Sequence, residues 1–192
     1  MLNYLNHKGT VILTTPRLIL RRFTVDDAQA MYNNWATDEK VTRFLAWEIH
    51  ESIEKTREIL TQWVDEYDSL EYYHWGIEYM HDGNIMIIGG INLHGVSNKS
   101  WRAELGYNIG SKWWNKGIMT EAAKAVLEFG FNEVGFNKIC ALHDTENVGS
   151  GRVMQKIGMI REGHFHKHSR RKDGSWGDIG FYSILKENWD NK

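Results

Sequence analysis

The chain has 192 residues, with 23 Lys and Arg against 25 Asp and Glu, and its formal net charge at pH 7 is −2. This length predicts one domain, spanning 1–192, whose core is large enough to be stable without disulfides. A hydrophobic share of 42% excludes a disordered chain. The near-neutral charge argues against nucleic acid as the primary partner, because phosphate binding requires a basic excess.

Hydrophobic periodicity and turn residues predict a mixed α/β chain with the element order β-α-α-β-β-β-α-β-α-β-β. The predicted strands cover 17–23, 74–80, 85–93, 102–109, 138–143, 159–168 and 176–185. The predicted helices cover 24–36, 51–67, 117–133 and 147–157. Thr24 is expected to cap the first helix, and His81-Asp82-Gly83-Asn84 is expected to form the turn between the second and third strands.

These elements predict a central, twisted, mostly antiparallel sheet with helices on both faces. The second, third and fourth strands form an antiparallel meander. The fourth strand, 102–109, and the fifth, 138–143, are expected to be parallel neighbours, because a helix connects them.

The segment that leads from the fourth strand into the helix at 117–133 carries the clearest sign of chemistry. Ala103, Leu105, Tyr107 and Ile109 share one face of the strand, and Glu104 lies on the other. Backbone N–H groups at the start of the following helix form an anion site suited to a pyrophosphate. An ordinary turn between a strand and a helix explains the same residues equally well. The usual dinucleotide and nucleoside triphosphate fingerprints are absent.

Three segments resemble motifs of the GNAT superfamily of N-acetyltransferases. Trp113-Trp114-Asn115-Lys116-Gly117-Ile118-Met119-Thr120-Glu121-Ala122 resembles its acetyl-CoA pyrophosphate loop, and Asn147-to-Met159 resembles its second cofactor helix. Thr15-Pro16-Arg17-Leu18-Ile19-Leu20-Arg21 is typical of the RimJ/RimL-like branch, which acetylates the N-termini of ribosomal proteins. The resemblance covers a core of about 14–187.

The resemblance implies a V-shaped splay between the fourth and fifth strands that admits the pantetheine arm of acetyl-CoA. It implies direct transfer of an acetyl group to a primary amine, namely the N-terminal α-amine of a ribosomal protein or peptide, with no metal. A small-molecule amine, a polyamine or an antibiotic is an alternative acceptor. A non-catalytic CoA-binding sensor is an alternative of another class. A monomer and a homodimer are both compatible with the sequence.

The resemblance also implies which residues bind the cofactor. They are Tyr107, Ile109, Trp114, Asn115, Lys116, Gly117, Ile118, Met119, Thr120, Asn147, Ser150, Arg152 and Lys156. Trp114 and Met119 depart from the general superfamily loop but fit the ribosomal-protein branch. Met154 stands where many members carry a tyrosine that protonates the leaving thiolate, so the resemblance assigns that role to Ser150.

Glu104 is the candidate general base, because amide formation requires a neutral amine. An α-amine has a pKa of about 7.7–8.0, so a modest base acting through water suffices. The alternatives are a solvated strand glutamate for Glu104, a packing residue for Ser150 and a simple helix cap for Asn147. Cys140 lies in an apolar strand and is expected to be buried and inert, which favours direct transfer.

Histidines alternate at His164, His166 and His168, so all three are expected on one face of a strand. Three histidines can bind zinc, but in this arrangement they fan outward over roughly 13 Å. A solvated face or a substrate rim is therefore expected rather than a metal site.

Several charged residues lie near the expected acceptor entrance. Arg170, Arg171 and Lys172 are expected in a solvated turn, with contact to ribosomal RNA or to a cofactor phosphate as the alternatives. Asp144 and Glu146 attract a cationic substrate or complement the dipole of the following helix.

The sequence also indicates a compartment. No apolar run approaches the roughly 18 residues of a membrane span, and the first eight residues contain no apolar signal core. The single cysteine fits a reducing environment. We therefore expect a cytoplasmic protein without membrane contact.

Trp47 lies in a loop that, by resemblance, shapes the acceptor pocket.

Overall fold

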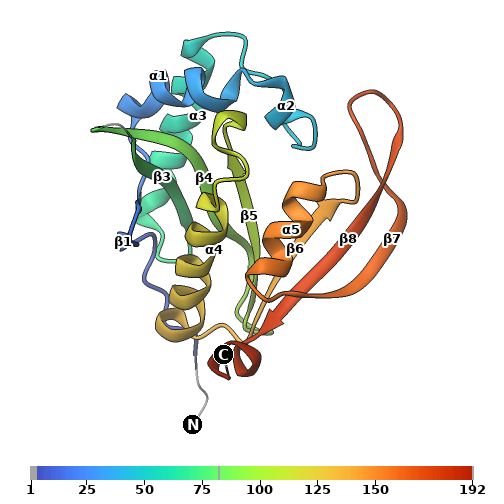
Figure 1. Ribbon diagram of the computed structural model, residues 1–192. Coiled ribbons are helices and arrows are strands. Elements are labelled where there is room, and N and C mark those ends of the chain that lie inside the picture. Colours follow the sequence, from blue (N-terminus) through green and yellow to red (C-terminus); the bar gives the residue numbers. More distant parts are fainter. Residues whose placement is uncertain (1–3, 82, 192) are drawn as a thin grey trace.

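A twisted sheet of eight strands forms the centre of the computed structural model, which describes residues 4–81 and 83–191 (Figure 1). The strands are β1 Leu13–Thr14, β2 Leu18–Arg21, β3 Tyr73–His81, β4 Asn84–Ser97, β5 Arg102–Ile109, β6 Lys138–Asp144, β7 Ile160–Arg170 and β8 Trp176–Leu185. Their order across the sheet is β1-β2-β3-β4-β5-β6-β8-β7. The β5–β6 pair is parallel and the other neighbouring pairs are antiparallel, which confirms the predicted sheet and its parallel pair.

Helices cover both faces of this sheet, as predicted. They are α1 Ala28–Met31, α2 Glu39–Thr42, α3 Ile53–Asp65, α4 Ile118–Glu128, α5 Val148–Lys156 and α6 Lys186–Asp190. The two-residue alternation of β3 separates two apolar clusters. Trp75 packs into the cluster that contains the buried side of α4, whereas His74 contacts Phe23 and Trp63 on the side of α1 and α3.

The prediction of one continuous helix at 24–36 is wrong. It divides into a 3-10 turn at Val25–Asp27, the short α1 and a π turn at Tyr32–Ala36. The wider π turn buries Trp35 and lets the Asn34 amide donate to the Ile87 carbonyl at 2.7 Å. The capping role of Thr24 is confirmed, since Asp27 accepts its backbone N–H at 2.8 Å in a capping box.

Other element bounds differ more modestly from the prediction. The helix predicted at 117–133 is α-helical only to Glu128 and ends in a π turn at Phe129–Val134. The sequence did not predict β1, α2 or α6. Asp82 of the predicted β3–β4 turn lies outside the described residues, while Gly83 has the positive φ expected of it, +78°. No helix in the described part of the chain is long and apolar enough to cross a membrane.

The β5–β6 pair separates soon after it begins. Its parallel pairing covers Arg102–Glu104 opposite Lys138–Cys140 and then stops. β5 continues beside β4 as far as Ile109, and β6 continues beside β8 as far as Asp144. Figure 1 shows the two strands diverging above their shared base. The V-shaped splay that was expected between the strands at 102–109 and 138–143 is thus present between β5 and β6.

Candidate active site

A cavity of about 510 Å³ opens at the wide end of the splay. Its walls come from the end of β5, the 110–117 loop, the first turn of α4, one side of α5, and α2 with the residues after it. All the predicted cofactor residues except Lys116 line it. The fold therefore brings together residues as far apart in the sequence as Lys40 and Lys156.

The start of α4 faces this cavity with Gly117, Ile118, Met119 and Thr120. Gly117 precedes the helix with φ +74°, a left-handed conformation that glycine adopts without strain. Asn115 is also left-handed, with φ +60°. The first N–H groups of α4 have no acceptor within the helix and lie at the positive end of its dipole. Such a terminus binds phosphate groups.

The N-terminal segment holds this loop in place. Thr15 donates to one Glu121 carboxylate oxygen at 2.6 Å, and Arg17 donates to the other through Nε at 2.7 Å. The Arg17 guanidinium also donates to the Lys116 carbonyl at 3.1 Å. The Lys116 ammonium lies over the Trp113 ring, 4.9 Å from its centroid, and outside the cavity lining. This anchoring role of Thr15 and Arg17 could not be predicted from the sequence, because Glu121 lies about a hundred residues away.

The start of α5 forms the opposite wall. Asn147 caps the helix, as its side chain accepts the Ser150 N–H at 3.2 Å. The Tyr107 hydroxyl lies 3.0 Å from both the carbonyl and the hydroxyl oxygen of Ser150, which links β5 to α5 across the splay. Burial raises the pKa of Tyr107 to about 12. Tyr107 is therefore a neutral hydrogen-bonding group that positions Ser150.

Glu104 and Ser150 are not brought together in the cavity. Glu104 lies in the last paired step of β5 and β6, outside the cavity lining, with its carboxylate 3.3 Å from His94 Nε2. Asn108 lies farther along the same face of β5 and does line the cavity. Its Oδ1 is buried and has no hydrogen-bond donor among the described residues. Asn108 was not among the site residues predicted from the sequence.

The α2 region adds residues that the sequence did not assign to the site, namely Lys40, Val41, Phe44 and Leu45. The run of bulky residues after α2 could have indicated that this loop lines the site. From this run, only Trp47 was assigned to the acceptor pocket. Trp47 itself does not line the cavity.

The turn containing Arg170, Arg171 and Lys172 is largely exposed, as predicted, but Arg171 is partly buried. Arg171 donates to both carboxylate oxygens of Asp144, at 2.7 and 2.9 Å. Lys172 donates to the Trp47 carbonyl at 2.5 Å. These two contacts join the hairpin turn to the end of β6 and to the loop after α2.

The acidic residues at the entrance are consequently paired. Glu146 lines the cavity and lies 2.6 Å from Arg171 and 3.3 Å from Arg43. Burial alone would raise the pKa of Asp144, but the Arg171 guanidinium and the Glu146 N–H hold it below its ordinary value. Little unpaired negative charge is left at this entrance.

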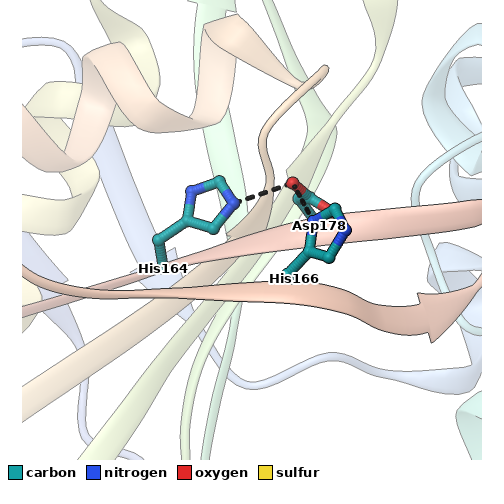
Figure 2. Close-up of side chains that lie close together, drawn as sticks. All are labelled: His164, His166 and Asp178. Atoms are coloured by element: carbon teal, nitrogen blue, oxygen red, sulfur yellow. Dashed lines mark hydrogen bonds and ion pairs between the residues drawn. The ribbon is translucent and has the colours of Figure 1, made fainter.

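Two further expectations have opposite outcomes. Cys140 is buried, as predicted, and burial raises the pKa of its thiol. The expected outward fan of three histidines is wrong, because His164 and His166 both turn toward Asp178 of β8 (Figure 2). His168 instead packs its ring 5.2 Å from that of Phe165. The irregular register between Phe165 and Ser169 explains the difference.

The chain matches the acetyltransferase (GNAT) domain over residues 17–160. It is 35% identical over 175 residues to the uncharacterized N-acetyltransferase YoaA of Bacillus subtilis (strain 168), covering 91% of this chain and 97% of that protein. It is 33% identical over 104 residues to the ribosomal protein uS5-alanine N-acetyltransferase of Escherichia coli (strain K12), covering 54% and 53%. A solved acetyltransferase of the GNAT family from Bacillus anthracis has a TM-score of 0.79 and 29% identity, covering 92% and 99%.

The anchor at Glu121 predicts a pH-dependent contribution to stability. Burial alone would raise the pKa of Glu121, but hydrogen bonds from Thr15 and Arg17 hold it below its ordinary value of 4.5. A carboxyl with a lowered folded-state pKa stabilises the fold above its unfolded pKa and loses that effect as the pH falls. Glu121→Gln is therefore expected to lower the free energy of unfolding by about 1 kcal/mol at pH 7 and by much less at pH 3.

Urea unfolding at both pH values measures this difference. Glu51→Gln, which alters an exposed carboxylate, is the matched control and is expected to change stability little at either pH. An equal loss at pH 7 and pH 3 for Glu121→Gln would contradict the assigned ion pair.

Proposed function

The chain belongs to the GNAT family of N-acetyltransferases, and we propose that it transfers the acetyl group of acetyl-CoA to the N-terminal α-amine of a protein or peptide, with ribosomal proteins as the leading class. Family membership implies acetyl-CoA as the cosubstrate. The observation that carries the proposal is the placement of an anion-binding helix terminus at the open end of a splayed parallel strand pair.

The residues of the cavity fit this cosubstrate. The N–H groups at the start of α4 suit its pyrophosphate, and Arg152 and Lys156 line the same cavity with positive charge. The Asn108 Oδ1 is buried and has no partner within the described part of the chain. It therefore suits an N–H donor, which the amide groups of a pantetheine arm provide. A buried acceptor without a donor is destabilising by about 1–3 kcal/mol, so a ligand that donates to it gains affinity.

In the proposed chemistry, Ser150 protonates the departing thiolate and Glu104 accepts the amine proton through water. The contact between the Tyr107 and Ser150 hydroxyls, 3.0 Å apart, holds Ser150 at the cavity wall. Glu104 lies outside the cavity lining, so the proton of the acceptor amine must reach its carboxylate through water. The inert state of buried Cys140 supports direct attack of the amine on the thioester.

The entrance supports an α-amine over a polyamine as the acceptor. Asp144 and Glu146 are already paired with arginines, so they offer little attraction to a polycation. An α-amine is partly neutral near pH 7.5 without a strong base. The similarity to a relative named for uS5-alanine acetylation supports a ribosomal-protein N-terminus.

A thiol-release assay with acetyl-CoA tests the acceptor class directly. Peptides with N-terminal Ala or Ser are compared with the same peptides blocked by N-formylation, with a polyamine and with an aminoglycoside. We expect release only with free peptide α-amines. Turnover restricted to the small amines would contradict the proposed acceptor, and CoA binding without turnover of any amine would favour a sensor.

Gly117→Val is expected to weaken CoA binding by at least tenfold. A β-branched side chain at φ +74° strains the loop and obstructs close approach of a phosphate to the backbone. Calorimetric titration with CoA measures the affinity. Gly135→Val is the control, because Gly135 also has a positive φ, +91°, but lies at the far end of the helical segment. Equal CoA affinity in the two folded variants would contradict the phosphate site.

The catalytic assignments predict distinct kinetic signatures. Glu104→Gln is expected to lower kcat/KM by about 10²–10⁴-fold, with a loss that shrinks as pH rises because the acceptor amine then deprotonates unaided. Ser150→Ala is expected to lower kcat without that pH dependence, and Cys140→Ala is expected to retain activity. Wild-type turnover by Glu104→Gln at all pH values, or a trapped acetyl-Cys140, would show that the roles are wrong.

A further inference from the structure

Three potential metal ligands meet on the β7–β8 hairpin (Figure 2). His164 Nε2 lies 2.7 Å from one carboxylate oxygen of Asp178, and His166 Nδ1 lies 3.1 Å from the other. One ligand atom from each residue lies within 4.8 Å of those of the other two. No other group of three or more histidine, cysteine or acidic residues with this spacing occurs in the part of the chain that the structure describes.

The irregular register of the hairpin orients the third ligand. Phe165 pairs with Ile179, and Ser169 pairs with Gly177. Between these two pairs β7 advances by four residues, whereas β8 advances by only two. The additional residues form a bulge in which Lys167 adopts φ +46°. The Lys167 N–H then donates to one Asp178 oxygen at 2.8 Å. A backbone hydrogen bond of this kind commonly fixes the orientation of a metal-binding carboxylate.

We propose that His164, His166 and Asp178 bind a divalent transition-metal ion of the zinc class. Two imidazole nitrogens and a carboxylate oxygen form a suitable donor set, and the fourth position is left for water. Metal–ligand bonds of about 2.0–2.2 Å place tetrahedral ligand atoms about 3.3 Å apart. The distances between these ligand atoms range from 2.7 Å to at most 4.8 Å. Small side-chain rotations therefore suffice to bring the ligand atoms to the spacing of a tetrahedral site.

Two charges near the site affect the affinity. The carboxylate of Asp178 attracts the ion, and the Arg161 guanidinium, which contacts His164 Nδ1, repels it. Arg161 is exposed and can rotate away. The proposal therefore predicts that Arg161→Ala binds the metal more tightly than the unaltered chain, whereas a simple hydrogen-bonded cluster gives no such gain.

The bound ion would connect the two strands of the hairpin whose tip contacts the cavity entrance through Arg171 and Lys172. The site lies outside the cavity lining, so its occupancy is independent of the acetyl-transfer proposal and does not require activity as a readout.

The test uses the untagged full chain, freed of metal by a chelator and titrated calorimetrically with zinc chloride alone. We expect one ion per chain at pH 7.5 and much weaker binding at pH 5.5, because both imidazoles must be deprotonated to bind. Titration with Co²⁺ is expected to give the absorption bands of a tetrahedral site.

Variants assign the ligands. His166→Ala and Asp178→Asn are each expected to weaken zinc binding by at least roughly 10–100-fold. That is the loss typical of removing a group that only orients a metal ligand, and these residues are ligands themselves. His166 is largely exposed, so its removal should leave the fold intact. His168→Ala removes a neighbouring histidine outside the cluster and is expected to bind normally. Absent binding in the unaltered chain, or equal affinity in His166→Ala and His168→Ala, would overturn the proposal.

Discussion

The parallel pairing of β5 and β6 stops after Glu104 and Cys140, and the site depends on this interruption. Each strand remains bonded to its outer neighbour, β4 or β8, so neither can move to close the gap. Backbone N–H and C=O groups along the separated edges need other partners. An extended ligand that carries amide groups can bond to such an edge as an added strand would.

Contacts between distant segments keep the splay in shape. On one side, Thr15 and Arg17 fix Glu121 and thereby the start of α4. On the other, α5 approaches β6 closely because Gly151 has no side chain, and an added Cβ would lie 2.7 Å from the His143 ring. The Tyr107–Ser150 contact joins the two sides. The start of α4 and the hydroxyl of Ser150 are therefore held in place from both sides of the splay.

Features governed by local chemistry could be predicted from the sequence. The alternation of β5, the positive φ of Gly83 and the Asn147 cap each depend on a few neighbouring residues. The π turns could not be predicted, because a 3.6-residue periodicity does not reveal where one extra residue is accommodated. The ion pair of Arg17 with Glu121 joins residues 104 positions apart, and the convergence of His164 and Asp178 depends on a bulge. The proton path from Glu104 remains a prediction.

Amide hydrogen exchange with and without acetyl-CoA tests the central claim most directly. The account predicts that the cosubstrate slows exchange at the separated part of β5, 105–109, and at the first turns of α4 and α5. Exchange in the β7–β8 hairpin at 160–170 should be unchanged when no metal is added. Saturating acetyl-CoA that leaves the first turn of α4 unprotected, or that protects mainly another surface, would contradict the claim that the splay holds the cosubstrate.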